Sequence, residues 1–88
     1  MKKRLQKSLY SHEWETLCAI LRRVRKEKGL TQVKLAELLG RQQNLIAKIE
    51  AGERKLDVCQ LLDYLDAMGA DPLDVISELV RESRRKKR

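Results

Sequence analysis

The residues best suited to chemistry in this sequence are polar side chains on one face of a helix predicted over residues 43–51. They are Gln43, Asn44 and Lys48, with the small residue Ala47 among them. Ile46 and Ile49 point the opposite way, into the protein, and leave this face free. Gln and Asn side chains can bond both N6 and N7 of adenine, Lys can reach O6 and N7 of guanine, and Ala can touch a thymine methyl group. This combination is typical of a helix that reads base pairs in the major groove of DNA.

Residues that can hold DNA phosphates surround this predicted reading helix. They are Gln32, Lys34, Arg41, Arg54 and Lys55. Gln32 is predicted to begin the preceding helix, where exposed backbone N–H groups attract a phosphate. Arg41 precedes the reading helix, and Arg54 and Lys55 follow it, so all three can reach the DNA backbone on either side.

The charge distribution also favours a polyanion as the binding partner. The 88 residues include 20 basic and 13 acidic ones, which gives a net charge of +7. Residues 22–55 carry ten basic and four acidic residues, whereas residues 56–80 carry six acidic residues and no basic one. Clustered positive charge is what a nucleic-acid-binding surface requires. The aromatic residues are only Trp14, Tyr10 and Tyr64, so the rings on which single-stranded binders stack bases are scarce, and double-stranded DNA is the expected partner.

Glycines and the single proline divide the chain into five segments whose apolar residues recur at helical spacing. The segments are residues 11–28, 32–39, 43–51, 57–68 and 71–80, with Ser11, Thr31, Asp57 and Asp71 as N-caps. The second and third are short and meet at a tight turn containing Gly40, which is the helix-turn-helix arrangement. We therefore predict an all-α, compact five-helix domain over residues 10–80. The basic residues 1–9 and 81–88 are expected to form a flexible arm and a flexible tail without regular structure.

Several other functions are disfavoured by what the sequence lacks. Cys18 and Cys59 lie in apolar segments and are expected to be buried, and His12 is the only histidine, so no metal-ligand spacing arises. No nucleophile–base pair is suggested, and no apolar run approaches the ~20 residues that cross a membrane. We expect a cytoplasmic protein that is not an enzyme and that has no cofactor, no metal and no small-molecule ligand.

A series of residues between Leu21 and Pro72 carries a recognisable pattern. It comprises Arg25, Gly29, Leu30-Thr31-Gln32, Leu35-Ala36, Leu39-Gly40, Gln43, Ile46, Ile49-Glu50, Gly52, Arg54 and Gly69-Ala70-Asp71-Pro72. Together these residues resemble the phage repressor and Cro-like helix-turn-helix family, often called the XRE family. The resemblance implies a lambda repressor-like domain whose third helix is the recognition helix. It further implies a phosphate contact at Gln32, base contacts at Gln43, Asn44 and Lys48, and an internal ion pair between Arg25 and Glu50.

Two positions depart from the family pattern. Position 42, which caps the recognition helix and is usually Ser or Thr, is Gln42 here. Glutamine is a poorer cap, so Gln42 is free to reach into the groove or to contact a phosphate. Position 34, often Glu in the family, is Lys34, which loses the reciprocal cap with Thr31 but adds a cation on the side that faces DNA.

Residues 56–80 contain more apolar side chains than one small core can accept. The face predicted to pack inward consists of Val58, Leu61, Leu62 and Leu65. The side chains left for a second subunit are Leu73, Ile76 and Val80, with Cys59 or Met68 beside them. Burying this patch in a two-fold dimer would remove an aggregation risk and would place two recognition helices about 34–36 Å apart, opposite inverted half-sites.

The leading interpretation is a sequence-specific transcription regulator, and more specifically a repressor, that binds an inverted-repeat operator as a homodimer. A second interpretation is a protein-interaction module or an antitoxin-like protein that binds a protein partner through the acidic residues 56–80 and reads little DNA. A third is a non-specific nucleic-acid binder that acts through its basic ends. Within the resembling family, phage repressors, restriction–modification controllers and antitoxins all remain open.

Overall fold

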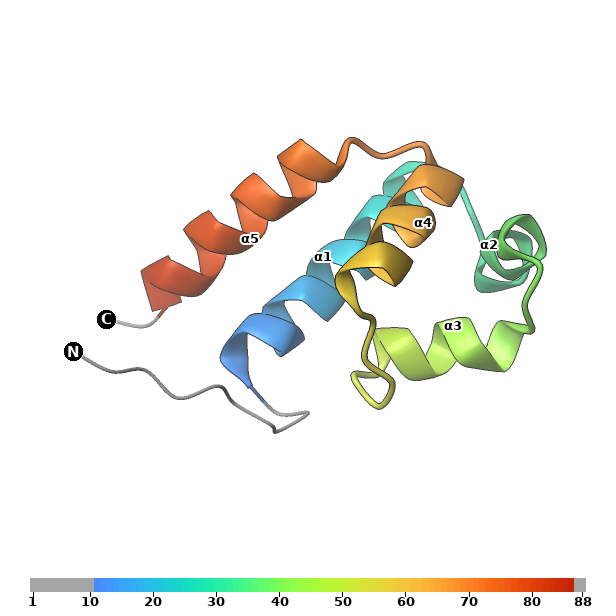
Figure 1. Cartoon of the computed structure of the whole chain (residues 1–88), viewed down its shortest axis with the longest axis horizontal. Helices are drawn as coiled ribbons and strands as arrows, with labels where there is room; N and C mark the ends of the chain where they lie inside the picture. Colours follow the sequence, from blue (N-terminus) through green and yellow to red (C-terminus); the bar gives the residue numbers. More distant parts are fainter. Residues whose placement is uncertain (1–10, 87–88) are drawn as a thin grey trace.

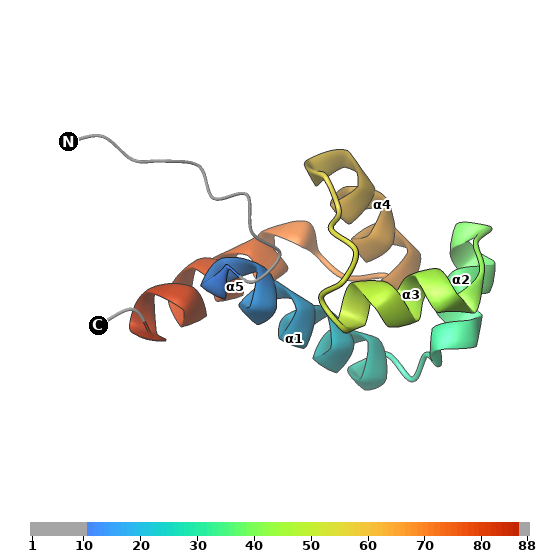
Figure 2. The ribbon, with the colours of Figure 1, turned by 90° about the horizontal axis from the view of Figure 1, so that it is seen from below.

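Five α-helices and the short turns between them make up residues 11–86, which are the residues that the computed structural model describes. The helices are α1 (His12–Glu27), α2 (Gln32–Leu39), α3 (Gln43–Glu50), α4 (Val58–Met68) and α5 (Pro72–Lys86). The helix α1 packs against α3 and α5, and α2 packs against α3 and α4. Figures 1 and 2 show α5 lying alongside α1 at one end of the molecule and α2, α3 and α4 gathered at the other. The predicted five-helix fold with a central helix-turn-helix is confirmed.

Side-chain caps fix where four of the helices begin. The predicted N-caps each accept a hydrogen bond from a backbone N–H two or three residues further on, at 2.7–3.2 Å, and they are Ser11, Thr31, Asp57 and Asp71. Each of these bonds satisfies a donor that has no partner within its own helix. At the other end of α2, Gly40 adopts a left-handed conformation with φ +66°, which ends the helix and turns the chain into α3.

The core joins α1 to the helix-turn-helix. The most deeply buried side chains come from α1 to α4 and are Leu21, Leu35, Ile46, Ile49, Tyr64 and Leu65. At the start of α1, the indole N–H of Trp14 donates to the carbonyl oxygen of Gly52 at 3.0 Å. Gly52 lies in the turn after α3 with φ +83°, and a Cβ there would lie 3.7 Å from the indole nitrogen. The end of α3 is therefore anchored on α1.

The inward face of α4 differs from the predicted one. Val58 and Leu62 are 73% and 46% exposed, and the side chains that pack inward are Leu61, Tyr64, Leu65 and Met68. Cys18 is buried as expected, whereas the expectation that Cys59 is buried is wrong. Apolar residues occupy most sides of this helix, so their spacing alone did not select the face. Since Met68 is buried, it is not available to a second subunit.

The helix α5 continues well past the predicted end of the domain at residue 80. The prediction of a tail without regular structure is therefore wrong for residues 81–86, which are helical. Ser83 is buried, and its hydroxyl donates to the carbonyl oxygen of Leu79 at 2.7 Å. Nearer the start of α5, Val75 is buried in the core and Glu78 pairs with Arg23 of α1, so that α5 is held along α1. Residues 87–88 of the predicted tail and the predicted arm at 1–9 lie outside the described residues.

Candidate DNA interface

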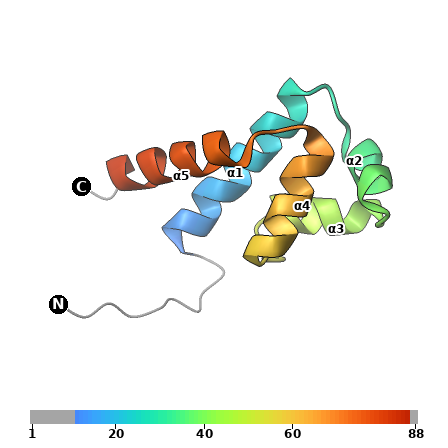
Figure 3. The same cartoon turned by 45° about the horizontal axis from the view of Figure 1, so that its top comes forward.

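The helices α2 and α3 form a tight pair that leaves one face of α3 open. Ala36 is buried where the two helices approach, and its carbonyl oxygen accepts the backbone N–H of Arg41 at 2.9 Å across the turn. Ile46 and Ile49 on α3 are completely buried. Figure 3 shows α2 and α3 together at the end of the molecule away from the last turn of α5. The inner face of α3 is therefore fixed in the core, and its outer face is free to meet a ligand.

The outer face of α3 carries the residues predicted to read bases. Gln42, Gln43, Asn44 and Lys48 are exposed, and Ala47 is partly buried among them. Gln42 occupies the N-cap position in extended conformation, but its side chain makes no capping hydrogen bond. The amides of Gln42 and Asn44 and the first backbone N–H groups of α3 are therefore suited to hydrogen bonding with base edges or phosphates.

The structure brings Arg25 and Glu50, the predicted ion pair, into direct contact between α1 and α3. Arg25 Nε lies 2.5 Å from Glu50 Oε2, and Nη2 lies 3.1 Å from Oε1, so the pairing is bidentate. The side chains are only 8% and 4% exposed. The hydrogen bond to Glu50 raises the pKa of Arg25 above its ordinary value, and a third bond, from Nη1 to the carbonyl oxygen of Leu30 at 2.7 Å, ties the pair to the turn before α2.

Two glutamines continue the hydrogen bonds of the Arg25–Glu50 pair to the surface of the protein. These two hydrogen bonds were not predicted from the sequence. Gln32, the first residue of α2, donates from Nε2 to Glu50 Oε1 at 3.0 Å. Gln43, the first residue of α3, donates from Nε2 to Gln32 Oε1 at 2.9 Å. The side chain of Gln32 is therefore engaged within the protein. Its backbone N–H, at the start of α2, remains the group suited to a phosphate.

Cations border the outer face of α3. Arg41, Lys48 and Arg54 line an open hollow of about 560 Å³ next to Gln42 and Asn44. All three are exposed, and the described residues provide no carboxylate partner for any of them. The other two cations predicted to bind phosphate lie differently: Lys34 Nζ is 3.8 Å from Glu37 Oε1, and Lys55 is half-buried. Unpaired positive charge thus borders the reading face.

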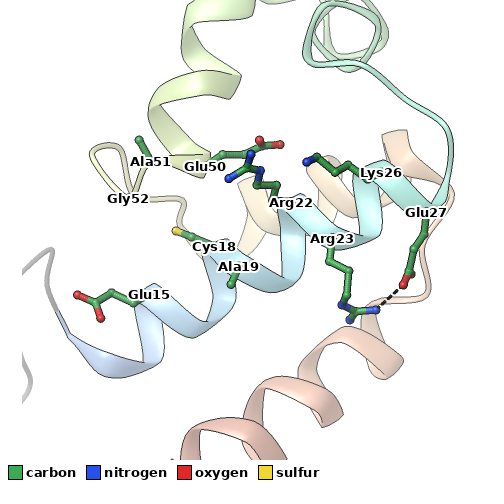
Figure 4. A pocket seen from close by; sticks show the side chains of 10 residues that line it. All are labelled: Glu15, Cys18, Ala19, Arg22, Arg23, Lys26, Glu27, Glu50, Ala51 and Gly52. Carbon is green, nitrogen blue, oxygen red and sulfur yellow. Dashed lines mark hydrogen bonds and ion pairs between the residues drawn. The ribbon is translucent and has the colours of Figure 1, made fainter.

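A second hollow, of about 700 Å³, lies between α1 and the end of α3. Figure 4 shows Arg22 and Lys26 extending from α1 on the side where Glu50 lies, while Arg23 turns away to pair with Glu27. Arg22 and Lys26 were not predicted as site residues. Their basic character was visible in the sequence, but only the packing of α1 decides which of its four neighbouring cations face α3.

The buried polar groups behind this interface are held neutral. Burial, followed by the charges of Glu50 and Glu15, raises the pKa of the Cys18 thiol to about 11. Burial and then the Glu50 charge also raise the pKa of Tyr64, whose hydroxyl is buried without a hydrogen-bond partner in the described part of the chain. Neither group is a reactive centre. Within residues 11–86, no group of three His, Cys, Asp or Glu side chains is placed to hold a metal ion, and no helix is long and apolar enough to cross a membrane.

The residues predicted to form a dimer interface gather on one face of α5. Leu73, Ile76 and Val80 are 76%, 39% and 42% exposed. Together with Ser77 and Arg81 they line a shallow apolar depression. Val75, on the opposite side of the helix, is buried. These three large apolar side chains do not take part in the packing of α5 on the rest of the domain. A stripe of exposed apolar side chains is suited to protein–protein contact.

A buried inner face, an open polar outer face and flanking cations define a helix-turn-helix protein of the DNA-binding class. A family profile described as a helix-turn-helix domain matches residues 16–79. An XRE-family like protein from Pseudomonas syringae pv. tomato str. DC3000 is 36% identical, with a TM-score of 0.75 over 80% of this chain and 85% of that one. The chain therefore belongs to the XRE-type helix-turn-helix family, whose members are DNA-binding transcription regulators and not enzymes.

Other solved structures share the fold. The clp gene regulator ClgR from Corynebacterium glutamicum is 28% identical, with a TM-score of 0.75 over 85% of this chain and 80% of that one. The restriction–modification controller protein C.Esp1396I, solved as a tetramer with its natural 35 base-pair operator, is 23% identical, with a TM-score of 0.76 over 83% of this chain and 96% of that one. No curated protein sequence matched the chain.

Proposed function

We propose that the protein is a sequence-specific transcription regulator that represses by binding an inverted-repeat operator as a homodimer, with α3 in the major groove. The observation that carries this proposal is the outer face of α3. Its hydrogen-bonding side chains are exposed, while its inner face is locked to α1 by the buried pair of Arg25 and Glu50. A reading helix needs both properties, because base discrimination depends on side chains held in a fixed register.

We assign two roles to the residues around α3. The base-reading group is Gln42, Gln43, Asn44, Ala47 and Lys48, and the phosphate-binding group is Gln32, Lys34, Arg41, Arg54 and Lys55. Arg41 and Arg54 are the strongest of the second group, because they are exposed and unpaired beside the reading face. Gln32 acts through its backbone N–H, since its side chain bonds Glu50 and Gln43.

The homodimer follows from the exposed stripe on α5. The controller protein C.Esp1396I binds its operator as a tetramer, which supports an assembly of several subunits on DNA for a chain of this fold. In this protein, Leu73, Ile76 and Val80 would be buried against the same stripe of a second copy. A two-fold axis through that contact would present two copies of α3 to successive turns of one face of the duplex, about 34–36 Å apart.

A binding selection tests the proposal. The full chain is incubated with a pool of randomised duplexes, and the recovered sequences are compared with scrambled duplexes of equal length over a range of salt concentrations. We expect an inverted repeat, an affinity ratio of roughly 10³ or more over the scrambled duplex, and binding that weakens as salt increases. Equal affinity for all duplexes would instead indicate a non-specific nucleic-acid binder. No binding at low salt would indicate a protein-interaction module.

A further inference from the structure

The hydrogen bonds that join the core to the reading face all point in one direction. Arg25 donates to both oxygens of Glu50, through Nε and through Nη2. Gln32 donates from Nε2 to Glu50, and Gln43 donates from Nε2 to Oε1 of Gln32. Glu50 is thus the final acceptor of a chain that begins on the outer surface of α3.

Glu50 imposes this direction because a carboxylate accepts hydrogen bonds and donates none. If the Gln32 amide turned over, its oxygen would face an oxygen of Glu50 with no proton between them. Glu50 Oε1 would keep its bond from Arg25 Nη2 but lose the one from Gln32. The side chain of Glu50 is 4% exposed, so bulk water would neither replace the lost bond nor screen the repulsion between the two oxygens. Gln32 must therefore aim Nε2 inward and offer Oε1 to its other neighbour.

The same reasoning passes to Gln43. Gln32 Oε1 points towards Gln43 and accepts an N–H from Gln43 Nε2 at 2.9 Å, and this bond favours one orientation of the Gln43 amide. An amide carries two N–H donors and one carbonyl acceptor. Since one donor is used on Gln32, the exposed end of Gln43 presents one N–H and one oxygen.

This pair of groups matches one purine and not the other. Adenine presents the N7 acceptor and the N6 donor in the major groove, whereas guanine presents two acceptors, N7 and O6. One donor and one acceptor satisfy adenine, but against guanine the oxygen of Gln43 would face O6. We propose that Glu50 is a positioning residue for base specificity, which acts through Gln32 to orient Gln43 so that Gln43 selects adenine over guanine.

The inference rests on the proposed function, because it takes Gln43 to contact a base. Its test uses the full chain and a duplex obtained from the randomised pool. The base pair that Gln43 reads is the one whose preference disappears in Gln43→Ala. Affinities are then measured by fluorescence anisotropy for this duplex and for a second duplex that differs only by guanine in place of adenine at that position.

For the unmodified protein we expect adenine to be preferred roughly 5- to 150-fold. In Glu50→Gln, the residue at position 50 can donate as well as accept, so both glutamines can turn over and Gln43 can offer two N–H groups to guanine. In Gln32→Ala, Gln43 loses its inner acceptor and is equally free to turn. Both variants should lower the adenine-to-guanine ratio towards one, mainly by gaining affinity for guanine relative to adenine.

Leu61→Ala is the matched control, because it truncates a buried side chain on α4 that takes no part in this hydrogen-bond chain. It should lower stability and leave the ratio unchanged. On the Gln43→Ala background, Glu50→Gln should not alter the ratio further. If Glu50→Gln fails to fold, as judged by circular dichroism, Gln32→Ala alone carries the test.

Two outcomes overturn the inference in distinguishable ways. If the pool yields a preferred sequence and the folded variants keep the original ratio, Glu50 has no positioning role, although the proposed function stands. If the pool yields no preferred sequence, the proposed function fails and this inference fails with it. The side-chain amide protons of Gln43 in the DNA-free protein give a separate readout: one should exchange slowly with water in the unmodified chain and neither should in Gln32→Ala.

Discussion

Replacing Arg25 with alanine should destabilise the folded domain by about 3–5 kcal/mol, because it leaves the charge of Glu50 buried without its partner. The structure supports a value in this range and not the small value of a surface pair. Both side chains are less than one-tenth exposed, and Arg25 makes two hydrogen bonds to the carboxylate. After the change, Gln32 is the remaining hydrogen-bond partner of Glu50. The change also removes the donor to the carbonyl oxygen of Leu30.

The assay is urea unfolding followed by circular dichroism, at one fixed protomer concentration because dimerisation would shift the apparent stability. Arg25→Ala, Glu50→Ala and the double variant complete a thermodynamic cycle. We expect the double variant to be about 2–3 kcal/mol more stable than the sum of the single effects predicts, because the second change removes a charge that the first has already stranded.

Arg23→Ala is the control on the same helix. Arg23 also contacts two carboxylates, of Glu27 and Glu78, but its side chain is 45% exposed. Water screens such a pair, so we expect a loss of about 1 kcal/mol or less. If Arg25→Ala cost no more than Arg23→Ala, or if the cycle were additive within error, burial would not be what makes the Arg25–Glu50 pair important.

Four further predictions concern the surface and the thiols. Ile76→Glu should give a helical monomer by sedimentation at micromolar concentration, with most operator affinity lost, because a charge would be placed in the proposed two-fold contact; a dimer with unchanged affinity would exclude α5 as the interface. Arg54→Ala should weaken binding to all duplexes alike and reduce the salt slope by about 1, as anisotropy titrations would show, whereas loss at one base position only would make Arg54 a base reader. Cys59 should react with a thiol reagent in the folded protein and Cys18 only on unfolding. Because the pKa of Cys18 is raised from 9.0 to about 11, its contribution to stability should be complete below pH 9 and lost as pH rises through 11, and urea unfolding of Cys18→Ala should lack this decline.

The starts of the helices and the end of α2 were predictable because local rules decide them. Ser11, Thr31 and Asp57 cap their helices through bonds to nearby backbone N–H groups, and Gly40 ends α2 by adopting a conformation that other residues avoid. None of these interactions depends on the rest of the fold. The place of α3 as the second helix of the helix-turn-helix was predictable in the same way, from the short lengths of α2 and α3 and from Gly40 in the turn between them.

The features that could not be predicted all depend on packing between distant segments. The helical spacing of α4 fits several inward faces, and only contact with the other helices selects Tyr64 and Met68 over Val58 and Leu62. Residues 81–86 contain no apolar side chain, so no periodicity marks them as helical. Their helix follows instead from α5 lying on α1 and from the buried hydroxyl of Ser83.

On the proposed function, the hydrogen-bond chain behind Gln43 limits which side chains can read a base from the first position of α3. Oε1 of Gln32 faces position 43 and accepts a hydrogen bond from it. Gln43→Lys supplies one and remains compatible with the chain, so that a reader of guanine can replace a reader of adenine. Gln43→Glu, which would be the change for reading cytosine, brings a carboxylate against Oε1 of Gln32, and Gln32 cannot turn over while its other end is held by Glu50. On the proposed function, the buried pair of Arg25 and Glu50 therefore also disfavours a carboxylate at position 43, unless Gln32 and Glu50 change with it.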